Sequence, residues 1–260
     1  MNLSGKVAIV TGGGTGVGRA TTALLSAAGC HTVITYSKSQ AEAEATAAAL
    51  TTDNVRVLAK QADVTDDAAC RRMVAETVAE LGGVHILIQC AGTTDFIPFD
   101  QIDQVTDDVW QRLFQVNVVG AFHCARAVRE PMVASGGGII VNVSSVAAQI
   151  AQGSSIPYCA SKAALDNLTI SLARTFAPHI RVNGVAPGFI TGRWLENGLG
   201  ETYERVKQAF ERSLPLGRVC DPGDVAAAIL SLVTGSRLIT GQTLVVDSGM
   251  LIAGFQAKFK

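Results

Sequence analysis

Short apolar runs alternate with longer helical patterns from one end of the chain to the other. The runs are rich in Val, Ile and Leu and have the length of buried strands, and most segments between them repeat their apolar residues at helical spacing. Such alternation favours right-handed βαβ units, which build a parallel sheet with helices on both faces. We therefore expect an α/β fold of three layers around a seven-stranded parallel sheet. The predicted strands are 6–11, 31–36, 55–60, 84–90, 138–144, 180–186 and 243–247, and the predicted helices are 18–28, 40–50, 66–81, 105–133, 158–176 and 221–233.

The chain has the organisation of one domain. Its 260 residues, 48% of them hydrophobic, can bury a large sheet, and they contain no linker rich in Pro, Gly or Ser and no internal repeat. Two stretches without a regular pattern, 93–104 and 187–215, follow predicted strands. Loops that leave the carboxyl ends of parallel strands surround the ligand crevice, so we expect 187–215 to form a substrate-binding loop or lid. We also expect Asp66 and Asp221 to cap the helices that they begin.

Charge and cysteine placement exclude several kinds of function. The 21 basic and 22 acidic residues leave a net charge of −1 without a Lys/Arg cluster, so nucleic acid is not an expected partner. The six cysteines lie far apart and form no Cys-x-x-Cys pair, which indicates reduced thiols and no metal site. The N-terminus does not resemble a secretory signal, and no apolar run reaches the ~18 residues of a membrane span. We expect a cytoplasmic protein with no membrane contact.

A glycine-rich loop joins the first predicted strand to the helix that follows. Residues 11–19 read TGGGTGVGR, and the order of strand, glycine turn and helix suits a pyrophosphate. Glycines permit a tight turn and let backbone N–H groups approach the phosphates, which the helix N-terminus stabilises. A glycine turn without a ligand is the alternative. The loop residues expected to contact a dinucleotide are Gly12, Gly14, Thr15, Gly16, Val17 and Gly18.

The end of the second predicted strand indicates which dinucleotide would bind. A protein that binds NAD places an acidic residue there, about 20 residues after the loop, to contact the ribose hydroxyls. This chain has Tyr36, Ser37 and Lys38 at that place. An acid would repel a 2′-phosphate, whereas hydroxyls followed by an ammonium could bind it, which favours NADP(H). NAD(H) stays open, because Ser37 and Lys38 could simply begin a solvated helix.

A tyrosine and a lysine stand four positions apart at the start of the predicted helix 158–176. This separation puts Tyr158 and Lys162 on one helical face. A free phenol has a pKa near ~10, and a nearby cation lowers that pKa because it stabilises the phenolate. Tyr158 could then serve as a general acid or base. Taken alone, such a pair is also common on surfaces that have no catalytic role.

These motifs, in this order, resemble the classical short-chain dehydrogenase/reductase family over nearly the whole chain, and most of all its 3-oxoacyl-carrier-protein-reductase-like members. The resemblance implies a Rossmann-like fold and a single dinucleotide-binding and catalytic domain over 1–260. It implies an NAD(P)(H)-dependent oxidoreductase that transfers hydride between the nicotinamide and a carbonyl/alcohol pair, and a homotetramer. The matching segments are the T-G-x-x-x-G-x-G loop at 11–18, Ser145 thirteen positions before Tyr158, Tyr-x-x-x-Lys at 158–162, 181–191 and 239–249.

The resemblance also gives each expected site residue a role. Tyr158 is the general acid/base, and Lys162 lowers its pKa and holds the nicotinamide ribose. Ser145, rather than Ser144, orients the substrate oxygen, and Asn117 supports a proton relay. The further cofactor contacts are Asp63 and Val64 at the adenine, Cys90, Ala91 and Gly92 on the adenosine side, and Pro187, Gly188, Ile190 and Thr191 at the nicotinamide end. Gln89-Cys90 departs from the family's Asn-Asn, which puts the side-chain hydrogen bonds of those amides in doubt.

The substrate side follows from the lid segment. Its apolar residues and indole indicate a hydrophobic or medium-sized carbonyl or alcohol substrate, and an acyl thioester fits the resemblance. The alternative function is a non-catalytic dinucleotide-binding regulator or scaffold, against which the intact catalytic set argues. An epimerase or dehydratase of the extended family fits poorly, because the glycine loop has the classical spacing. The residues expected near the reacting group are Gln152, Phe189, Trp194 and Leu195.

Overall fold

Parallel strands form the centre of the molecule. In the computed structural model, which describes residues 1–253, seven strands pair in parallel in the order β3-β2-β1-β4-β5-β6-β7. The predicted seven-stranded parallel sheet is confirmed. The chain order reverses between β1 and β4, and open α/β sheets bind ligands beyond the carboxyl ends of the strands at such a point. The strands are β1 (Val7–Thr11), β2 (His31–Tyr36), β3 (Val57–Gln61), β4 (Ile86–Gln89), β5 (Gly138–Val143), β6 (Ile180–Pro187) and β7 (Thr243–Val246).

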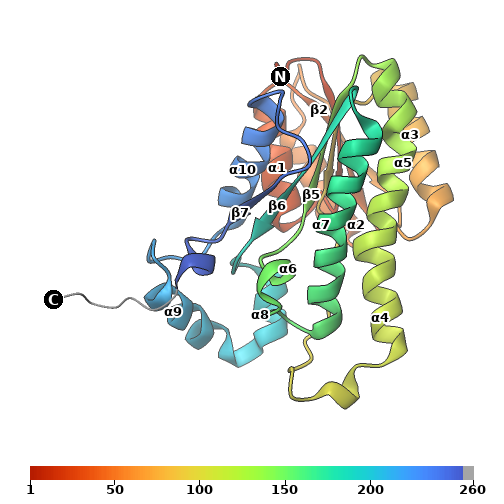
Figure 1. Ribbon diagram of the computed structural model, residues 1–260. Helices are drawn as coiled ribbons and strands as arrows, with labels where there is room; N and C mark the ends of the chain where they lie inside the picture. The colour runs from red at the N-terminus through yellow and green to blue at the C-terminus, as the bar shows by residue number, and fades with distance from the viewer. Residues whose placement is uncertain (254–260) are drawn as a thin grey trace.

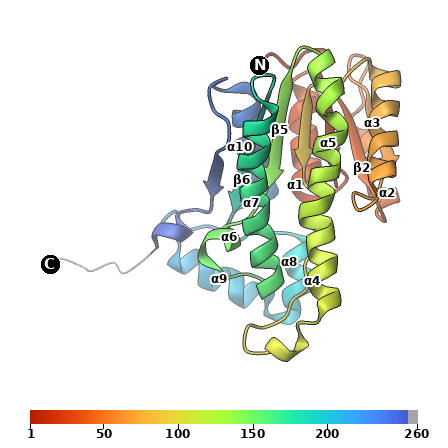
Figure 2. The ribbon, with the colours of Figure 1, turned by 45° about the vertical axis from the view of Figure 1, so that its right-hand side comes forward.

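Helices cover both faces of the sheet and give the predicted three layers (Figure 1). Residues of α1, α2 and α10 pack on one face, and residues of α3, α5 and α7 pack on the other. Figure 2 shows α3, α5 and α7 side by side in front of the strands. These helices are α1 (Gly16–Ala27), α2 (Gln40–Leu50), α3 (Asp67–Leu81), α5 (Gly120–Ala134), α7 (Ile156–Phe176) and α10 (Pro222–Thr234).

The central strands are buried on both sides, which explains their continuous apolar sequence. Along β1, Ala8 and Val10 face the core under α1 and α10, while Ile9 faces the core under α5 and α7. All three are fully buried. Burial of one aliphatic side chain such as Ile9 contributes roughly 1.5–3 kcal/mol. The strand ends that carry the site are therefore anchored in the best-packed part of the fold.

Two predicted helix caps are present. The carboxylate of Asp66 accepts the backbone N–H groups of Ala68 and Ala69 at the start of α3. At α10, Asp221 and Asp224 accept each other's backbone N–H groups in a capping box. Within residues 1–253, no helix combines the length and the apolar character needed to cross a membrane.

The helix predicted over 105–133 is not continuous. It consists of α4 (Asp107–Phe114), a π-helical turn η2 (Gln115–Val119) and α5. A π turn accommodates one residue more than a regular helical turn, and such turns occur frequently at functional sites. The turn carries Asn117, whose position therefore differs from that in a regular helix.

The stretch 187–215, which we expected to be irregular, is largely helical. Gly192 and Gly200 stand at the two ends of its first helix with φ angles of +125° and +52°, a conformation that favours glycine. The helices share a small apolar cluster of their own, so the segment that we expected to form a lid is a folded unit beside the sheet (Figure 1). The lid elements are α8 (Arg193–Leu199), η3 (Gly200–Thr202) and α9 (Tyr203–Ser213), and the buried cluster is Phe189, Tyr203, Leu214 and Val219.

Candidate active site

Close contacts shape the glycine loop. A Cβ added at Gly18 would lie 2.3 Å from the carbonyl oxygen of Gly12, and one added at Gly14 would lie 2.8 Å from the Cα of Ala43 on α2. Gly16 instead has a φ of +49°, and a Cβ added there would have no atom within 4 Å. The loop therefore needs glycine at Gly14 and Gly18 for packing and at Gly16 for its conformation, and its face at Gly16 is accessible to a ligand.

The N-terminus of α1 has no side-chain cap. Thr15 occupies the N-cap position in an extended conformation, but its side chain makes no capping hydrogen bond, and the first turn contains no acidic residue. Asp66 and Asp221, by contrast, cap α3 and α10. The first N–H groups of α1 thus keep their hydrogen-bonding capacity for an anion. Together with the accessible face at Gly16, this fits the pyrophosphate of a dinucleotide.

The end of β2 borders a recess of about 290 Å³. Ser37, Lys38 and Asp63 line it, while Tyr36 packs against the core. The carboxylate of Asp63 accepts the N–H and the hydroxyl of Thr65 at 2.9 and 2.8 Å. The recess has a further lining residue on α3, an arginine, which the sequence reasoning missed because it lies far along the chain.

Val64 lies away from this recess. It is buried, and a Cβ added at Gly120 would lie 2.7 Å from its Cγ2, so the side chain packs under the start of α5. Its carbonyl oxygen is 3.0 Å from Nδ1 of His123. The side chain expected at the adenine therefore packs against α5 and does not line the recess at the end of β2.

The turn after β4 lies against the glycine loop. The N–H of Ala91 donates to the hydroxyl of Thr11 at 3.1 Å. Gln89, at the departure from the family pattern, is buried and donates through Nε2 to Ala121 O and to Asn142 Oδ1, both at 3.0 Å. The glutamine therefore ties β4 to β5 and α5 from inside the protein.

The π turn directs Asn117 toward the turn after β4. Its Oδ1 accepts the N–H of Thr93 at 2.8 Å, and its Nδ2 donates to Thr93 O and to Ser161 Oγ, both at 3.0 Å. The residue is 1% exposed. The amide thus connects its own helix to the loop and to α7, directly behind the predicted catalytic pair.

Three predicted catalytic side chains meet beyond the carboxyl end of β5. The hydroxyl of Ser145 accepts the N–H of Ala147 at 3.1 Å and lies close enough to Tyr158 to act on the pKa of its phenol. Lys162 lies one turn further along α7, with Nζ 5.7 Å from the centre of the Tyr158 ring, and donates to Val143 O at 2.9 Å. Ser144 instead donates to the carbonyl of Lys162 at 3.3 Å. The geometry thus favours Ser145 over Ser144 for a contact with substrate.

Gly92, in the turn after β4, lies close to the polar side-chain atoms of Asn117 and Lys162. A Cβ added to this glycine would lie 3.4 Å from Asn117 Oδ1 and 3.7 Å from Lys162 Nζ. A larger residue would enter the space in front of both polar groups. Residues from β4, η2, β5 and α7 are therefore assembled around one turn.

Burial controls the pKa values of the catalytic pair. It raises the pKa of Tyr158 to about 12, against the opposing effect of the Ser145 hydrogen bond, and it lowers the pKa of Lys162 to about 8. Desolvation is the largest cause of the raised pKa of Tyr158, and the ammonium of Lys162 is bonded to Val143 O, so a lowering of this pKa by Lys162 stays a prediction. Burial also raises the pKa of Cys90 to about 12, which keeps this thiol neutral.

Several known proteins are similar to this chain over nearly their full length. The family model described as enoyl-(acyl carrier protein) reductase matches residues 12–251. A Burkholderia xenovorans protein of known crystal structure, assigned to the short-chain dehydrogenases/reductases, has 34% identity and a TM-score of 0.88 over 95% of this chain and 98% of its own. The chain belongs to the short-chain dehydrogenase/reductase family. It is therefore an oxidoreductase that uses NAD(P), as the resemblance implied.

Three relatives show the range of this short-chain dehydrogenase/reductase's neighbours. A Streptomyces violaceoruber protein, assigned as ketoacyl reductase 2 of the granaticin polyketide synthase, is 37% identical over 94% of this chain and 95% of its own. The NAD-dependent glycerol dehydrogenase of Listeria innocua is 34% identical over 96% of both chains. The 3-oxoacyl-[acyl-carrier-protein] reductase of Synechocystis is 32% identical over 96% of this chain and 98% of its own.

In this short-chain dehydrogenase/reductase, the exit of β6 lies beside Ser145, the predicted catalytic serine. The carbonyl of Pro187 accepts the N–H of Val146, the residue after Ser145, at 3.0 Å. The N–H of Gly188 donates to β7, and that of Thr191 donates to Cys220 O, each at 2.9 Å. Residues 187–191 are thus held in place next to Ser145, where the nicotinamide end of the cofactor was expected.

Helix α8 of the lid lies across the mouth of the site. The indole of Trp194 reaches the turn after β4, with Cη2 3.7 Å from the Cβ position of Gly92. At the other end of α8, a Cβ on Gly198 would overlap the ring of Phe96 in the stretch 93–104. Trp194 is thus the predicted substrate residue that the structure brings to the catalytic set.

An ion pair joins α8 to α2, the helix that packs against the glycine loop. Arg193 donates to Oε1 of Glu42 on α2 at 2.8 Å, across 151 positions of sequence. This hydrogen bond is the largest cause that lowers the pKa of Glu42. Since Ala43, the next residue, packs against Gly14, the lid is attached directly beside the glycine loop.

Two other predicted substrate residues, Phe189 and Leu195, pack in the apolar cluster of the segment 187–215. Phe189 is buried in the lid cluster, with ring centres 6.0 Å from Tyr203 and 5.2 Å from Phe210. Leu195 packs against the same cluster, and Gln152 is exposed in the loop before α7. Sequence reasoning treated the segment as a loop and therefore could not separate the residues that support the lid from those that line the mouth.

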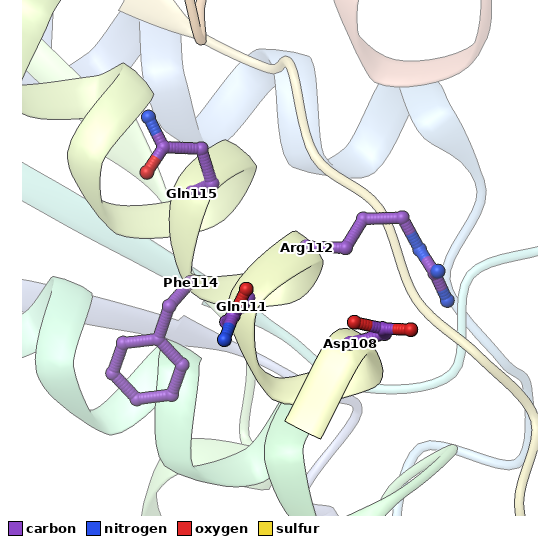
Figure 3. A pocket seen from close by; sticks show the side chains of 5 residues that line it. All are labelled: Asp108, Gln111, Arg112, Phe114 and Gln115. Carbon is purple, nitrogen blue, oxygen red and sulfur yellow. The ribbon is translucent and has the colours of Figure 1, made fainter. Parts of the chain in front are cut away.

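A larger recess of about 530 Å³ lies on the outside of α4 (Figure 3). Figure 3 shows Asp108 and Arg112 on one side of the helix and Phe114 pointing away from them. Arg112 pairs with Asp95, and none of the predicted site residues lines the recess. Its lining residues are Asp108, Gln111, Arg112, Phe114 and Gln115. Size alone therefore does not identify the active site of this protein.

Proposed function

We propose that Tyr158 transfers the proton in a reaction that interconverts a carbonyl compound and an alcohol. The observation that carries this proposal is the convergence of Asn117, Ser145, Tyr158 and Lys162 around the turn after β4. A surface Tyr-x-x-x-Lys pair would leave its ammonium in water, but Lys162 is 5% exposed. Burial of a cation is costly, and residues with strongly shifted pKa values cluster at functional sites.

The residues present can perform the proton chemistry. The nicotinamide ring of a bound cofactor supplies or takes up the hydride. Ser145 holds the substrate oxygen beside the hydroxyl of Tyr158. In reduction, Tyr158 gives its proton to that oxygen as negative charge develops there, and in oxidation it takes the proton back. The raised pKa of Tyr158 keeps the phenol protonated at neutral pH, which suits reduction.

Lys162 and Asn117 assist the transfer of the proton on the Tyr158 hydroxyl without contacting the substrate oxygen. The ammonium of Lys162 stabilises the phenolate left on Tyr158, and we assign it the nicotinamide ribose as a second contact. Asn117 fixes the backbone of Thr93 and the hydroxyl of Ser161 next to the lysine. We assign Asn117 the support of a proton relay that restores the proton on Tyr158.

NADP(H) is the cofactor that we propose. Ser37 and Lys38 line the recess at the end of β2, and no acidic residue follows the strand directly. A hydroxyl and an ammonium suit a 2′-phosphate, whereas an acid would suit the ribose hydroxyls of NAD. NAD(H) is the alternative, since one relative is named an NAD-dependent glycerol dehydrogenase.

For the substrate we propose a small carbonyl or alcohol compound, with an acyl thioester as the leading class. Two relatives are named for the reduction of ketoacyl or 3-oxoacyl groups. The lid and the segments beside it expose apolar side chains, among them Trp194 on α8 and Phe99, Ile102 and Ile150 in the neighbouring segments. An apolar rim would accommodate an acyl chain, because its burial releases apolar surface from water.

We further propose a homotetramer that works in the cytoplasm. Phe122 and Val133 on α5 and Ile170 on α7 are exposed apolar side chains on neighbouring helices, which a second copy would cover. All six cysteines are free, as is usual for proteins kept in a reducing compartment.

The test is turnover with and without the Tyr158 hydroxyl. Purified protein is incubated with NADPH or NADH and a panel of ketones and 3-oxoacyl thioesters, and Tyr158→Phe is assayed in parallel. We expect turnover with at least one substrate, a loss of roughly 10²–10⁴-fold in Tyr158→Phe, and an unchanged cofactor Kd. Tyr203→Phe removes a phenol from the lid and serves as the matched control. Normal cofactor binding with no turnover by any form would identify a regulator or scaffold instead.

A further inference from the structure

The arginine that lines the recess at the end of β2 is Arg72. It lies on α3, while Ser37 and Lys38 follow β2, so the pairing of β2 with β3 and the chain reversal into α3 bring two cations to one recess. Within residues 1–253, Lys38 forms no ion pair. The recess therefore combines an ammonium, a guanidinium and the hydroxyl of Ser37.

Arg72 is less tightly held than the other cations around α3. Its guanidinium lies 3.9 Å from Oδ2 of Asp66, and its side chain is 66% exposed. Arg71, the next residue, contacts Asp67 at 2.8 Å, and Lys60 pairs with two glutamates of α3. An exposed pair at the limit of contact contributes little, so Arg72 can exchange its carboxylate for a stronger anion.

The direction of Arg72 suits the adenosine half of a dinucleotide. Side chains on a helix tilt toward its N-terminus, and the contact with Asp66 shows that the guanidinium lies near the start of α3. That end of the helix follows the carboxyl end of β3, on the ligand side of the sheet. The two carboxylates nearby are already engaged, since Asp66 caps α3 and Asp63 accepts two hydrogen bonds from Thr65.

We propose that Arg72 and Lys38 together bind the 2′-phosphate of NADP(H), with Arg72 as a specificity-determining residue. The proposal rests on the NADP(H) preference proposed above and deepens it. A planar guanidinium can donate two parallel hydrogen bonds to a phosphate, while an ammonium contributes a point charge. The phosphate replaces the distant contact between Arg72 and Asp66 and is bound from two sides of the recess.

The experiment compares adjacent arginines. Arg72→Gln, Lys38→Gln and the matched control Arg71→Gln are titrated with NADPH and with NADH at one fixed ionic strength. We expect Arg72→Gln to weaken NADPH binding about tenfold and NADH binding by less than about twofold. Arg71→Gln should change neither, because its guanidinium faces Asp67 and not the recess. The thermal unfolding midpoints of the three variants and the native protein establish that each is folded.

The other results of these titrations distinguish a failure of the Arg72 proposal from a failure of the proposed NADP(H) preference. Equal weakening of NADPH and NADH by Arg72→Gln would mean that the guanidinium contacts the adenine, which overturns the phosphate site. If Lys38→Gln weakens NADPH and Arg72→Gln does not, the NADP(H) preference stands and the role of Arg72 is wrong. If native protein binds the two cofactors equally and neither variant changes this, both proposals are wrong.

Discussion

The two halves of the site satisfy their polar groups in opposite ways. At the glycine loop, the N–H groups that begin α1 have no side-chain partner, although α3 and α10 are both capped by aspartates. Around the proposed catalytic residue Tyr158, Asn117 makes three hydrogen bonds and Lys162 donates to a backbone carbonyl. One half keeps its donors for a ligand, and the other is positioned in advance by its neighbours.

The difference follows from what each half must do. A phosphate brings strong acceptors and negative charge, so backbone donors at a helix N-terminus are sufficient to bind it. Proton transfer needs a fixed geometry between groups of matched acidity, and surrounding hydrogen bonds provide that geometry. The second solution places an ammonium in a desolvated position, which destabilises the folded state.

The strongest test of this contrast is Lys162→Met. The variant keeps the volume of the side chain and removes the buried charge, so we expect activity to fall by at least about 10³-fold. We expect the free energy of unfolding to rise by roughly 1–4 kcal/mol, because replacement of a buried charge by an apolar group is often stabilising. Activity is measured by turnover and stability by urea unfolding.

The pH dependence of this stabilisation has a definite sign. The pKa of Lys162 is lowered from 10.5 to about 8 in the folded protein, so the unfolded chain binds the proton more tightly. The gain from Lys162→Met should therefore be largest below pH 8 and shrink between pH 8 and 10.5. A variant that is less stable than the native protein at pH 7 would show that the ammonium contributes net stability.

A cap installed on α1 tests the other half. In Thr15→Asp, the new carboxylate would accept the first N–H groups of the helix, as Asp221 does at α10. We expect the free energy of unfolding to rise by about 0.5–2 kcal/mol. Cofactor binding should weaken by roughly 10–100-fold, because the carboxylate occupies the donors and repels the pyrophosphate. Thermal unfolding and cofactor titration measure the two effects.

Asp221→Ala is the control for this variant. It removes the cap of another helix, α10, so stability should fall by about 1 kcal/mol while the cofactor Kd changes far less than in Thr15→Asp, because the N–H groups of α1 are unaltered. If Thr15→Asp bound cofactor as tightly as the native protein, the N-terminus of α1 would not be the pyrophosphate site.

A smaller effect is expected from pH alone. For the reduction of a carbonyl substrate, kcat/KM should be flat below about pH 8 and fall above it, up to about tenfold per pH unit, as Lys162 loses its proton. Tyr158 stays protonated over this range because its pKa is about 12. A steady-state pH profile measures this, and a decline that begins only near pH 10 would mean that Lys162 keeps its ordinary pKa.

The sequence predicted the features that are local or strictly periodic. These features depend on neighbours a few residues away. They are the alternation of strands and helices, the caps at Asp66 and Asp221, and the placement of Tyr158 and Lys162 on one helical face. Ser145 comes near Tyr158 because Ser145 follows the end of β5 and Tyr158 lies at the start of α7, the next long helix. These parts could be derived without coordinates.

The features that the sequence could not show depend on contacts between distant segments. The π turn at Asn117 is stabilised by hydrogen bonds to Thr93 and Ser161, which a helical pattern does not contain. The lid helices depend on a small cluster around Phe189. Arg72 enters the recess through the packing of α3, and the pKa of Tyr158 depends on how completely the pair is buried.

The attachment of α8 on two sides has a consequence for turnover. The helix is joined to α2 through Arg193 and Glu42 and packs against 93–104 through Gly198 and Phe96. Because both contacts lie on one seven-residue helix, we expect α8 to move as a unit, so that an opening at the coenzyme side would also open the alcohol side. Exchange of this segment between relatives to alter the range of accepted alcohols would therefore also alter how long the coenzyme stays bound, unless the residues at both attachment points were exchanged with it.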